Sequence, residues 1–378
     1  MHILIAPDSF KENLSAAKVA SAINAGVKAS APEATSQKIP MSDGGEGAIE
    51  LLKTLKLGKI VACPSLDPLM RSINSEYFLF NDKKTAWIEL SRAAGLGLLT
   101  KQERDPKITS TYGVGLLIKN AIEKGCKEII LGIGGSATND AGSGLLSALG
   151  FKFLDLQNKI LPQGGASLIN LNRIEHPKTE ELKEVSWTIA CDVDNPLIGN
   201  NGAVAIYSKQ KGASDKDMII LENSFCHFSA LIETNYSKKI RDLKGGGSAG
   251  GIAAGMFGLL NIKIEKGFTL LSKLSNLEGA IKKADLIITA EGKIDGQTLH
   301  GKVPIGIASI AKKYNIPVVC IAGIIEPPLT ALYEHGISGI FSIHQGPIST
   351  KESYVNSEVL IKNSTQRIID FYKNILIL

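Results

Sequence analysis

A glycine-rich turn between an apolar run and a helix-like segment is the feature that most constrains this chain. Residues 127–150 read KEIILGIGGSATNDAGSGLLSALG. The branched apolar run at 129–133 is typical of a strand that is buried on both faces. Glycines then remove the side chains from the turn, and the polar residues at 136–140 can cap a helix that ends at Gly150. A strand, a bare turn and a helix start predict an α/β fold.

The same turn would collect backbone N–H groups beside the positive end of a helix dipole, which suits a phosphate or a carboxylate. Tight packing is the alternative explanation for glycines between a strand and a helix. The pattern Gly132-x-Gly134-x-x-Ala137 also fits the loose dinucleotide fingerprint, with Asp155 near the distance expected for a ribose partner. The short helix with internal glycines is not typical of a dinucleotide fold, so this turn leaves the three interpretations open.

Length and composition limit the class of protein. The chain has 378 residues, enough for one large or two ordinary domains. Its net charge of +5 is spread along the sequence without a Lys/Arg block, which gives nucleic-acid binding little support. The five cysteines form no CxxC pair, and the six histidines lack zinc-ligand spacing. Reduced thiols, no signal-like N-terminus and no apolar run of transmembrane length predict a cytoplasmic protein that does not bind membranes.

Polar residues follow the first expected strand, at 2–6. Asp8, Ser9 and Lys11 come directly after it, and a helix is expected to begin near Ser15. Ligands of open α/β sheets bind at the carboxyl ends of strands, so these three side chains are candidates for a site. Capping of the turn would explain Asp8 and Ser9, but it would not explain Lys11.

A second candidate loop reads SDGGEG at 42–47. Its glycines place two carboxylates, Asp43 and Glu46, in an uncluttered loop before a helix. Asp43 could simply cap that helix, whereas glycine on both sides of Glu46 is harder to explain by capping. The stretch 59–90 then predicts antiparallel strands joined by short turns. Arg71 lies in one turn and could clamp a small carboxylate, although a solvated turn arginine is the commoner interpretation.

Two carboxylates follow another expected strand, at 187–191. Asp192 and Asp194 stand at its carboxyl end, and the Asn-Pro pair after them forces a turn. Such carboxylates could hold Mg²⁺ or contact a reacting hydroxyl. We expect a functional role for Asp192 and a structural one, in the turn, for Asp194.

A second glycine-rich loop, GGGSAGG at 245–251, contains Gly246 and Gly247. A strand is expected before it, at 203–207, followed by a largely helical stretch. The loop could be a hinge, a tight helix-packing site or another phosphate contact, and the sequence leaves these three interpretations open.

Charged residues also follow the strand expected at 286–289. Glu291, Lys293 and Asp295 stand at its end. Further along, GQTLHGK at 296–302 nearly matches a P-loop, but valine replaces the Ser/Thr that would ligate magnesium, so we interpret it as a near-miss. Alternation of strands and helices continues to a C-terminal helix at 353–375.

The combination of these features is more specific than any one of them. Backbone N–H groups and lysines can hold phosphates, carboxylates can hold Mg²⁺, and one carboxylate can accept the proton of an acceptor hydroxyl. The sequence has no obvious Ser/His/Asp or Cys/His set for nucleophilic catalysis. It therefore favours an enzyme of phosphoryl transfer.

The loops resemble those of the bacterial glycerate kinase family with two domains. The resemblance covers nearly the whole chain, because the matching blocks run in order from its start to beyond residue 300. Small departures exist, such as Ala290 for a usual Gly and Ser248 for a common Ala. Lys293 replaces a common Arg and so lacks a bidentate fork. The blocks are PDSFKE at 7–12, SDGGEG at 42–47, TSTYGVG at 109–115, GIGGSATNDAGSG at 132–144, CDVDNPL at 191–197, KQKGA at 209–213, GGGSAGG at 245–251 and AEGKIDGQTLHGK at 290–302.

The resemblance implies ATP-dependent, Mg²⁺-assisted phosphorylation of a hydroxyl of D-glycerate, giving a phosphoglycerate and ADP. It implies a Rossmann-like α/β domain with a mostly parallel sheet, at 1–45 and 265–378. A mixed α/β domain, at 46–264, is inserted in it, with the active site in the cleft between the two. Which hydroxyl is phosphorylated stays open, and so does the choice between a monomer and a homodimer.

The motif positions also suggest a role for each candidate residue. Asp192 or Asp295 would accept the hydroxyl proton, and Lys11 would neutralise charge on the transferred group. Asp8 and Asp43 would hold Mg²⁺ or the substrate hydroxyls. The candidates by role are Asp8, Ser9, Asp43 and Arg71 for the substrate, Asp43 and Glu291 for the metal ion, and Gly134, Gly135, Ser136, Gly246 and Gly247 for ATP.

Two other classes of protein would use some of the same features. A nicotinamide-dependent dehydrogenase of small hydroxy acids would use the pattern that begins at Gly132, and it would bind NADH but not ATP. A non-catalytic sensor of a phosphorylated metabolite would bind tightly without turnover. Several carboxylates argue against the sensor, because a phosphate site gains nothing from added negative charge.

Overall fold

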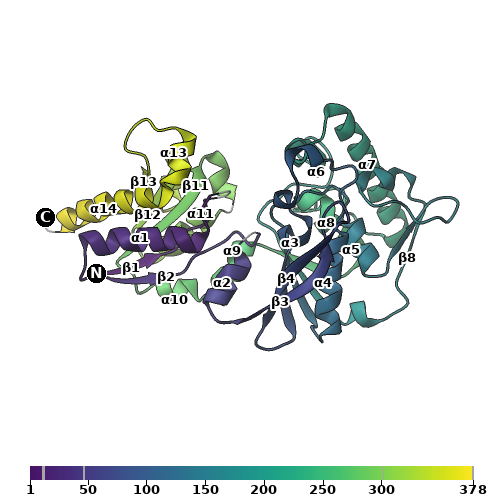
Figure 1. Ribbon diagram of the computed structural model, residues 1–378, viewed down its shortest axis with the longest axis horizontal. Coiled ribbons are helices and arrows are strands. Elements are labelled where there is room, and N and C mark those ends of the chain that lie inside the picture. Colours follow the sequence, from purple (N-terminus) through teal and green to yellow (C-terminus); the bar gives the residue numbers. More distant parts are fainter. Residues whose placement is uncertain (11–12, 46, 301, 377–378) are drawn as a thin grey trace. The chain divides into compact units, whose positions relative to one another are not determined.

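The computed structural model describes residues 1–378 except 11–12, 46, 301 and 377–378 (Figure 1). Contacts between residues divide the chain into two compact units. Unit 1 comprises Met1–Asp43 and Phe268–Leu378, and unit 2 comprises Gly44–Gly267. Unit 2 is therefore an insertion in the sequence of unit 1.

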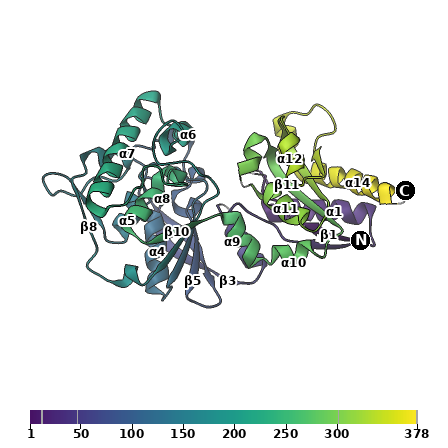
Figure 2. The same ribbon diagram turned by 180° about the vertical axis from the view of Figure 1, so that it is seen from behind.

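Unit 1 contains a five-stranded sheet in which every neighbouring pair is parallel. Apart from the polar edge strand at 35–38, its strands are rich in apolar residues, as expected where helices cover both faces. The helices α1 (Ala16–Ser30) and α14 (Ser357–Leu376) pack together on one face, and α11 (Val303–Lys312) packs on the other (Figures 1 and 2). In sheet order the strands are β13 (Gly339–Ser342), β12 (Val318–Ile325), β11 (Leu286–Ile294), β1 (His2–Ile5) and β2 (Thr35–Lys38).

The order of these strands defines a topological switch point beside β1. Counted along unit 1 alone, the order is 2-1-3-4-5, so β1 lies between β2 and β11. The chain continues from β1 to β2 on one side of it, and the next strand of unit 1, β11, lies on the other side. Doubly wound sheets bind ligands in the crevice at such a switch point, outside the carboxyl ends of the strands. The loops after β1 and β11 occupy that position.

Unit 2 contains a six-stranded mixed sheet. Four of its strands are parallel neighbours, whereas β3, β4 and β5 form an antiparallel meander, which confirms the antiparallel strands predicted for 59–90. A separate two-stranded sheet pairs β7 (Lys152–Leu154) with β8 (Arg173–Glu175). In sheet order the six strands are β10 (Ile262–Glu265), β9 (Ser186–Ala190), β6 (Glu128–Gly132), β5 (Thr85–Glu89), β4 (Ser72–Phe80) and β3 (Gly58–Leu66).

The sequence predicts most helices, with two errors. The start of α1 is confirmed, because Ser15 is its N-cap residue. The strand expected at 203–207 is wrong, since this run forms a helix that packs against α8 (Ser248–Leu259). Periodicity cannot separate a strand from a helix for five apolar residues. The C-terminal helix is two helices, because the chain leaves helical geometry at Asn356.

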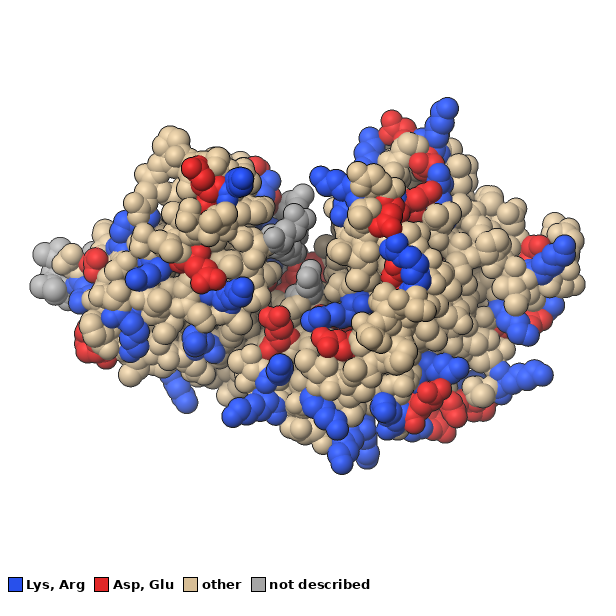
Figure 3. All heavy atoms as spheres, viewed as in Figure 1, with Lys and Arg blue, Asp and Glu red and all other residues tan. Residues whose placement is uncertain are grey.

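The remaining helices complete the two units. None of the helices in the described part of the chain combines the length and the apolar character that a membrane span requires. Basic and acidic side chains are interspersed over much of the visible face of each unit (Figure 3). The other helices are α2 (Ala48–Thr54), α3 (Ser91–Ala94), α4 (Tyr112–Glu123), α5 (Ser143–Ala148), α6 (Ala203–Tyr207), α7 (Asp215–Tyr236), α8 (Ser248–Leu259), α9 (Gly267–Leu274), α10 (Leu277–Ile281), α12 (Thr330–Glu334) and α13 (Thr350–Val355).

Candidate active site

Asp8 lies at the switch point of unit 1. It follows β1, and its backbone N–H donates to the Ala290 carbonyl on β11 at 2.9 Å. The side chain is 3% exposed, and its Oδ1 accepts a hydrogen bond from the Ser9 N–H at 2.6 Å. A buried carboxylate in this crevice is unusual unless other groups compensate its charge. Asp8 therefore has the position expected of a ligand-binding residue.

Glu291 lies on the neighbouring strand. Because β11 extends to Ile294, Glu291 lies within the strand. The sequence had suggested a position after the end of the strand. Its side chain is 5% exposed, and Oε1 lies 3.9 Å from Nζ of Lys302. Lys302 also donates to the Lys293 carbonyl at 3.2 Å. This pairing gives the crevice a second buried carboxylate and a cation from the near-miss P-loop segment.

Asp295 follows the end of β11 and is 15% exposed. Lys293 Nζ lies 3.4 Å from Asp295 Oδ2 and 2.8 Å from Glu326 Oε2. The hydrogen bond to Glu326 is the main reason that the pKa of Lys293 is raised. The charge of Lys293 is thus balanced by two carboxylates.

Asp43 follows β2, the third strand at this edge. The Met41 N–H donates to the Pro7 carbonyl at 2.8 Å, so the segment before Asp43 runs beside the segment after β1. Asp8, Asp43 and Asp295 therefore come after the carboxyl ends of three adjacent parallel strands. Lys11, the predicted charge-neutralising residue, lies outside the described residues.

The glycine-rich turn of unit 2 follows β6. The backbone N–H groups of Gly134, Gly135 and Ser136 donate no hydrogen bond to the part of the chain that the structure describes. Gly135 is exposed and has a φ of +72°, a left-handed conformation that suits glycine. Successive N–H groups around a left-handed residue form a concave site for anions. This turn is suited to a phosphate through its backbone.

The helix after this turn starts later than the residues at 136–140 had suggested. The helix α5 begins at Ser143, and Asp140 lies before it with its side chain fully buried. Asp140 accepts hydrogen bonds from the Thr111 N–H at 2.8 Å and from the Gly144 N–H at 3.2 Å, so it caps the starts of both α4 and α5. Burial raises the pKa of Asp140, and these hydrogen bonds oppose the rise. The helix dipole therefore acts on Asp140 and not on the turn.

The second glycine-rich loop, at 245–251, packs against the first. A Cβ on Gly250 would lie 1.9 Å from the Thr138 carbonyl oxygen, and one on Gly247 would lie 2.0 Å from the Pro196 carbonyl oxygen. A Cβ on Gly246 would lie 2.9 Å from the Leu243 carbonyl oxygen. Close packing explains these glycines, one of the three interpretations that the sequence leaves open.

Asp192 follows β9, the strand beside β6. Its Oδ2 accepts a hydrogen bond from the Gly267 N–H at 3.1 Å, and the side chain is partly exposed. Asp194 is exposed, which fits the structural role expected for it. Asp192 is therefore held at the carboxyl edge of the unit 2 sheet, where its side chain is partly exposed.

Glu89 is a residue that the sequence reasoning missed as a site candidate. It ends β5, next to β6, and its side chain is fully buried. Oε1 accepts a hydrogen bond from the Ile49 N–H at 2.9 Å, and Oε2 pairs with Arg92 Nε at 3.0 Å. A carboxylate at the end of the apolar run TAWIE was the signal that could have identified it. Glu89 anchors the first turn of α2, directly after the SDGGEG loop.

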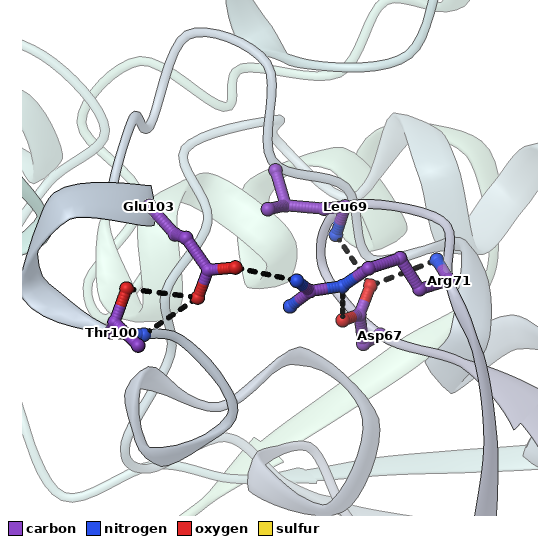
Figure 4. A network of polar contacts seen from close by, with 5 residues as sticks. All are labelled: Asp67, Leu69, Arg71, Thr100 and Glu103. Carbon is purple, nitrogen blue, oxygen red and sulfur yellow. Dashed lines mark hydrogen bonds and ion pairs between the residues drawn. The ribbon is translucent and has the colours of Figure 1, made fainter.

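Arg71 is bound to two carboxylates (Figure 4). Its Nε lies 2.5 Å from Asp67 Oδ2, and its Nη1 lies 2.5 Å from Glu103 Oε1. Asp67 also accepts hydrogen bonds from the Leu69 and Arg71 N–H groups. These bonds raise the pKa of Arg71, with the Asp67 bond as the largest cause. The network orders the turn, so a substrate carboxylate would have to share or replace a partner of Arg71.

The dinucleotide interpretation finds no geometry to support it. Asp155 follows β7, which belongs to the separate two-stranded sheet and is not a parallel neighbour of β6. Its Oδ1 accepts hydrogen bonds from the Gln157 and Lys159 N–H groups, both at 2.9 Å. Asp155 therefore stabilises a tight turn and does not reach the glycine-rich turn as a ribose partner would.

Unit 2 also contains a cavity of about 780 Å³. Ser186 and Trp187, at the amino end of β9, are among its lining residues. The carboxyl ends of the strands carry the candidate residues, and none of these candidates lines the cavity. The cavity is therefore separate from the predicted site.

Comparisons with known proteins agree with the resemblance of the motifs. A model of the glycerate kinase family matches residues 3–373. A glycerate kinase from Halalkalibacterium halodurans is 40% identical over 97% of this chain and 97% of its own. A glycerate 2-kinase from Escherichia coli K12 is 41% identical over 91% of this chain and 90% of its own. A crystal structure assigned as glycerate kinase 2 from Salmonella typhimurium LT2 is 38% identical, covers 100% of both chains and has a TM-score of 0.84. This chain belongs to the glycerate kinase family.

Proposed function

We propose that this protein transfers the γ-phosphoryl group of ATP to a hydroxyl of D-glycerate. The observation that carries the phosphoryl-transfer chemistry is the turn at 134–136, whose three N–H groups are available to an anion. The relatives named glycerate kinase, similar over nearly the whole chain, support D-glycerate as the acceptor. The carboxylates at the strand ends of unit 1 supply the acidic groups that such a reaction needs.

The proposed reaction assigns the proton to a carboxylate. The substrate hydroxyl attacks the γ-phosphorus, the bond to the bridging oxygen of ADP breaks, and Asp192 or Asp295 accepts the hydroxyl proton. Asp8, Ser9 and Asp43 would hold the substrate, with Arg71 as a clamp for its carboxylate, and Lys11 would neutralise charge on the transferred group. The ATP phosphates would bind Gly134, Gly135 and Ser136 first, with Gly246 and Gly247 as further predicted contacts.

Mg²⁺ is part of the proposal, because the candidate residues of unit 1 include carboxylates, the type of ligand that it prefers. Mg²⁺ prefers oxygen ligands and is commonly held by one or two carboxylates together with substrate phosphates. Glu291 lies on β11 and Asp43 follows β2. Asp8 follows β1, the strand between these two. We propose that Glu291 and Asp43 hold the ion, with Asp8 as the third candidate. When bound, Mg²⁺ would neutralise charge on the phosphates.

The position of phosphorylation is proposed to be the 2-hydroxyl. The name of the Escherichia coli relative, glycerate 2-kinase, supports this choice. We also propose that the two units are separate domains with limits near residues 43–46 and 264–268. We further propose that the protein is cytoplasmic and is either a monomer or a homodimer. Light scattering of the pure protein would distinguish these two states.

A coupled ADP-release assay tests the reaction. The reaction contains ATP, Mg²⁺ and D-glycerate, and L-glycerate replaces the substrate in the control. We expect ADP release that requires D-glycerate, and a phosphorus NMR spectrum with the phosphate on the 2-oxygen. If folded protein releases no ADP with either D-glycerate or L-glycerate, glycerate is not the acceptor. A phosphate on the 3-oxygen would overturn only the position.

A further inference from the structure

Lys211 is a buried lysine to which the proposed reaction assigns no role. It belongs to the KQKGA block at 209–213, and its side chain is only 2% exposed. It lies in a short 3₁₀ turn, Lys209–Lys211, that ends at Gly212 with a φ of +97°. Burying an ammonium group costs several kcal/mol unless its surroundings compensate it, so its contacts require an explanation.

The contacts of Lys211 lead to the glycine-rich turn. Nζ donates to the Thr138 carbonyl at 2.6 Å and to the Asn139 Oδ1 at 3.0 Å. Asn139 is oriented from its other side, because its Nδ2 donates to Ser208 Oγ at 2.6 Å. Ser136 Oγ lies 3.4 Å from the same Thr138 carbonyl and accepts the Thr138 N–H at 3.1 Å. Lys211 and the last residue of the proposed phosphate turn therefore share one acceptor.

Among the described residues, Asp140 is the ionisable group whose field acts on the charge of Lys211. This field favours the ammonium form, whereas the other facing side chains, Thr138, Asn139 and Ser208, do not titrate near neutral pH. Burial lowers the pKa of Lys211 to about 7. The ammonium form is thus present below neutral pH and is progressively lost above it.

We propose that Lys211 is a positioning residue for ATP, which orders the turn at 134–136 through Thr138 and provides positive charge behind its N–H groups. The proposal rests on the proposed function, in which this turn binds ATP phosphates. Lys211 is too buried to touch the nucleotide itself. Its effect is therefore expected on the binding of ATP and not on D-glycerate.

Two variants of the same motif provide the test. Lys211→Met removes the charge and keeps an unbranched chain. Lys209→Met is the matched control, because Lys209 is 67% exposed and pairs with an exposed Asp215 at 3.0 Å. We expect Lys211→Met to raise the KM for ATP by about tenfold, the effect of one charge-assisted hydrogen bond. The kcat and the KM for D-glycerate should change by less than about threefold, and Lys209→Met should match the wild type.

The pH profile of the wild type gives a second measurement, with Lys211→Met as its control. The ratio kcat/KM for ATP should fall as the pH rises through about 7, the pKa of Lys211, because the ammonium form is lost. The ratio for D-glycerate should not show this fall, and Lys211→Met should abolish it. A structural role alone would lower kcat and the melting temperature together and leave no such profile.

Failure of this inference can be separated from failure of the proposed function. An active wild type whose kcat/KM for ATP does not fall above pH 7, or a folded Lys211→Met with the wild-type KM for ATP, would overturn the role of Lys211. A wild type without D-glycerate-dependent turnover would overturn the proposed function. In that case calorimetric titration of ADP into wild type and Lys211→Met still measures whether Lys211 supports binding of phosphates.

Discussion

Lys211 and Thr138 are joined by a 2.6 Å hydrogen bond between a buried ammonium group and a backbone carbonyl. The two residues are 73 positions apart in the sequence. The bond connects the KQKGA turn to the segment that follows β6, and Gly250 packs on the same carbonyl from the second glycine-rich loop. Three separate blocks of the sequence therefore meet at the Thr138 carbonyl.

The stability of the protein should depend on Lys211 above neutral pH. The native pKa is about 7 and the ordinary value is 10.5, so between these pH values the unfolded chain binds one more proton than the native one. Stability contributed at Lys211 therefore rises with pH, by at most about 1.4 kcal/mol per pH unit. We expect the unfolding free energy of the wild type to rise relative to that of Lys211→Met by roughly 2 kcal/mol from pH 7 to pH 9, measured with urea. A difference that stays constant with pH would contradict the lowered pKa of Lys211. For the control Lys209→Met, the difference from the wild type should not change with pH.

Replacement of the proposed base should affect turnover. Asp192→Asn is expected to lower kcat by roughly 10²–10⁴-fold, since an amide cannot accept the hydroxyl proton. The matched control is Asp194→Asn, two residues further on in an exposed turn, which should keep kcat near that of the wild type. The same assay on Asp295→Asn distinguishes the two candidates for the base. Near-normal turnover of both Asp192→Asn and Asp295→Asn would exclude both as the proton acceptor.

Arg71 can be tested against its own ion-pair partner. If Arg71 binds the substrate carboxylate, Arg71→Gln should raise the KM for D-glycerate by about tenfold. Glu103→Gln removes the same ion pair but leaves the guanidinium, so it should leave this KM unchanged. Equal effects of the two variants in steady-state kinetics would indicate that the pair only orders the turn.

Glu89 should contribute more to stability than Glu76, the more exposed carboxylate that pairs with the same arginine. Glu89→Gln weakens the pair between the fully buried Glu89 and the partly exposed Arg92, and we expect it to lower the unfolding free energy by roughly 1–3 kcal/mol. Glu76→Gln is the control, because Glu76 pairs with the same arginine at 3.0 Å but is 33% exposed. Its cost should be below about 1 kcal/mol. Urea unfolding of both variants measures the difference, and equal costs would refute a special role for the buried carboxylate.

Gly250 should tolerate no side chain. It has a φ of +73°, and a Cβ would lie 1.9 Å from the Thr138 carbonyl oxygen, so Gly250→Ala should cost roughly 3 kcal/mol of stability. Gly199 has a φ of +94° with no atom near the added Cβ, so Gly199→Ala should cost only about 1 kcal/mol. Thermal unfolding compares the two. A similar loss in both would show that the contact with Thr138 adds nothing to the conformational strain.

Much of the local structure follows from short-range patterns. Ser15 starts α1 because its hydroxyl accepts the Lys18 N–H, and a serine before an apolar stripe is enough to predict this. The run at 203–207 was mispredicted because five apolar residues fit a strand as well as a helix. Asp140 shows the same limit for a polar residue: its position before α5 was visible, whereas its second role, as a cap of α4, depends on a contact with Thr111.

The order and chemistry of the motif blocks were readable in the sequence by itself, because glycines, carboxylates and strand-like runs are local properties. They determined the α/β class, the kind of reaction and the candidate residues Asp8, Asp192 and Glu291. Only the tertiary structure decided that Lys211 and Glu89 are buried beside the motif loops, and that the glycines at 245–251 pack against Thr138. Burial and close packing arise from residues far apart in the chain, and no local pattern records which of them meet.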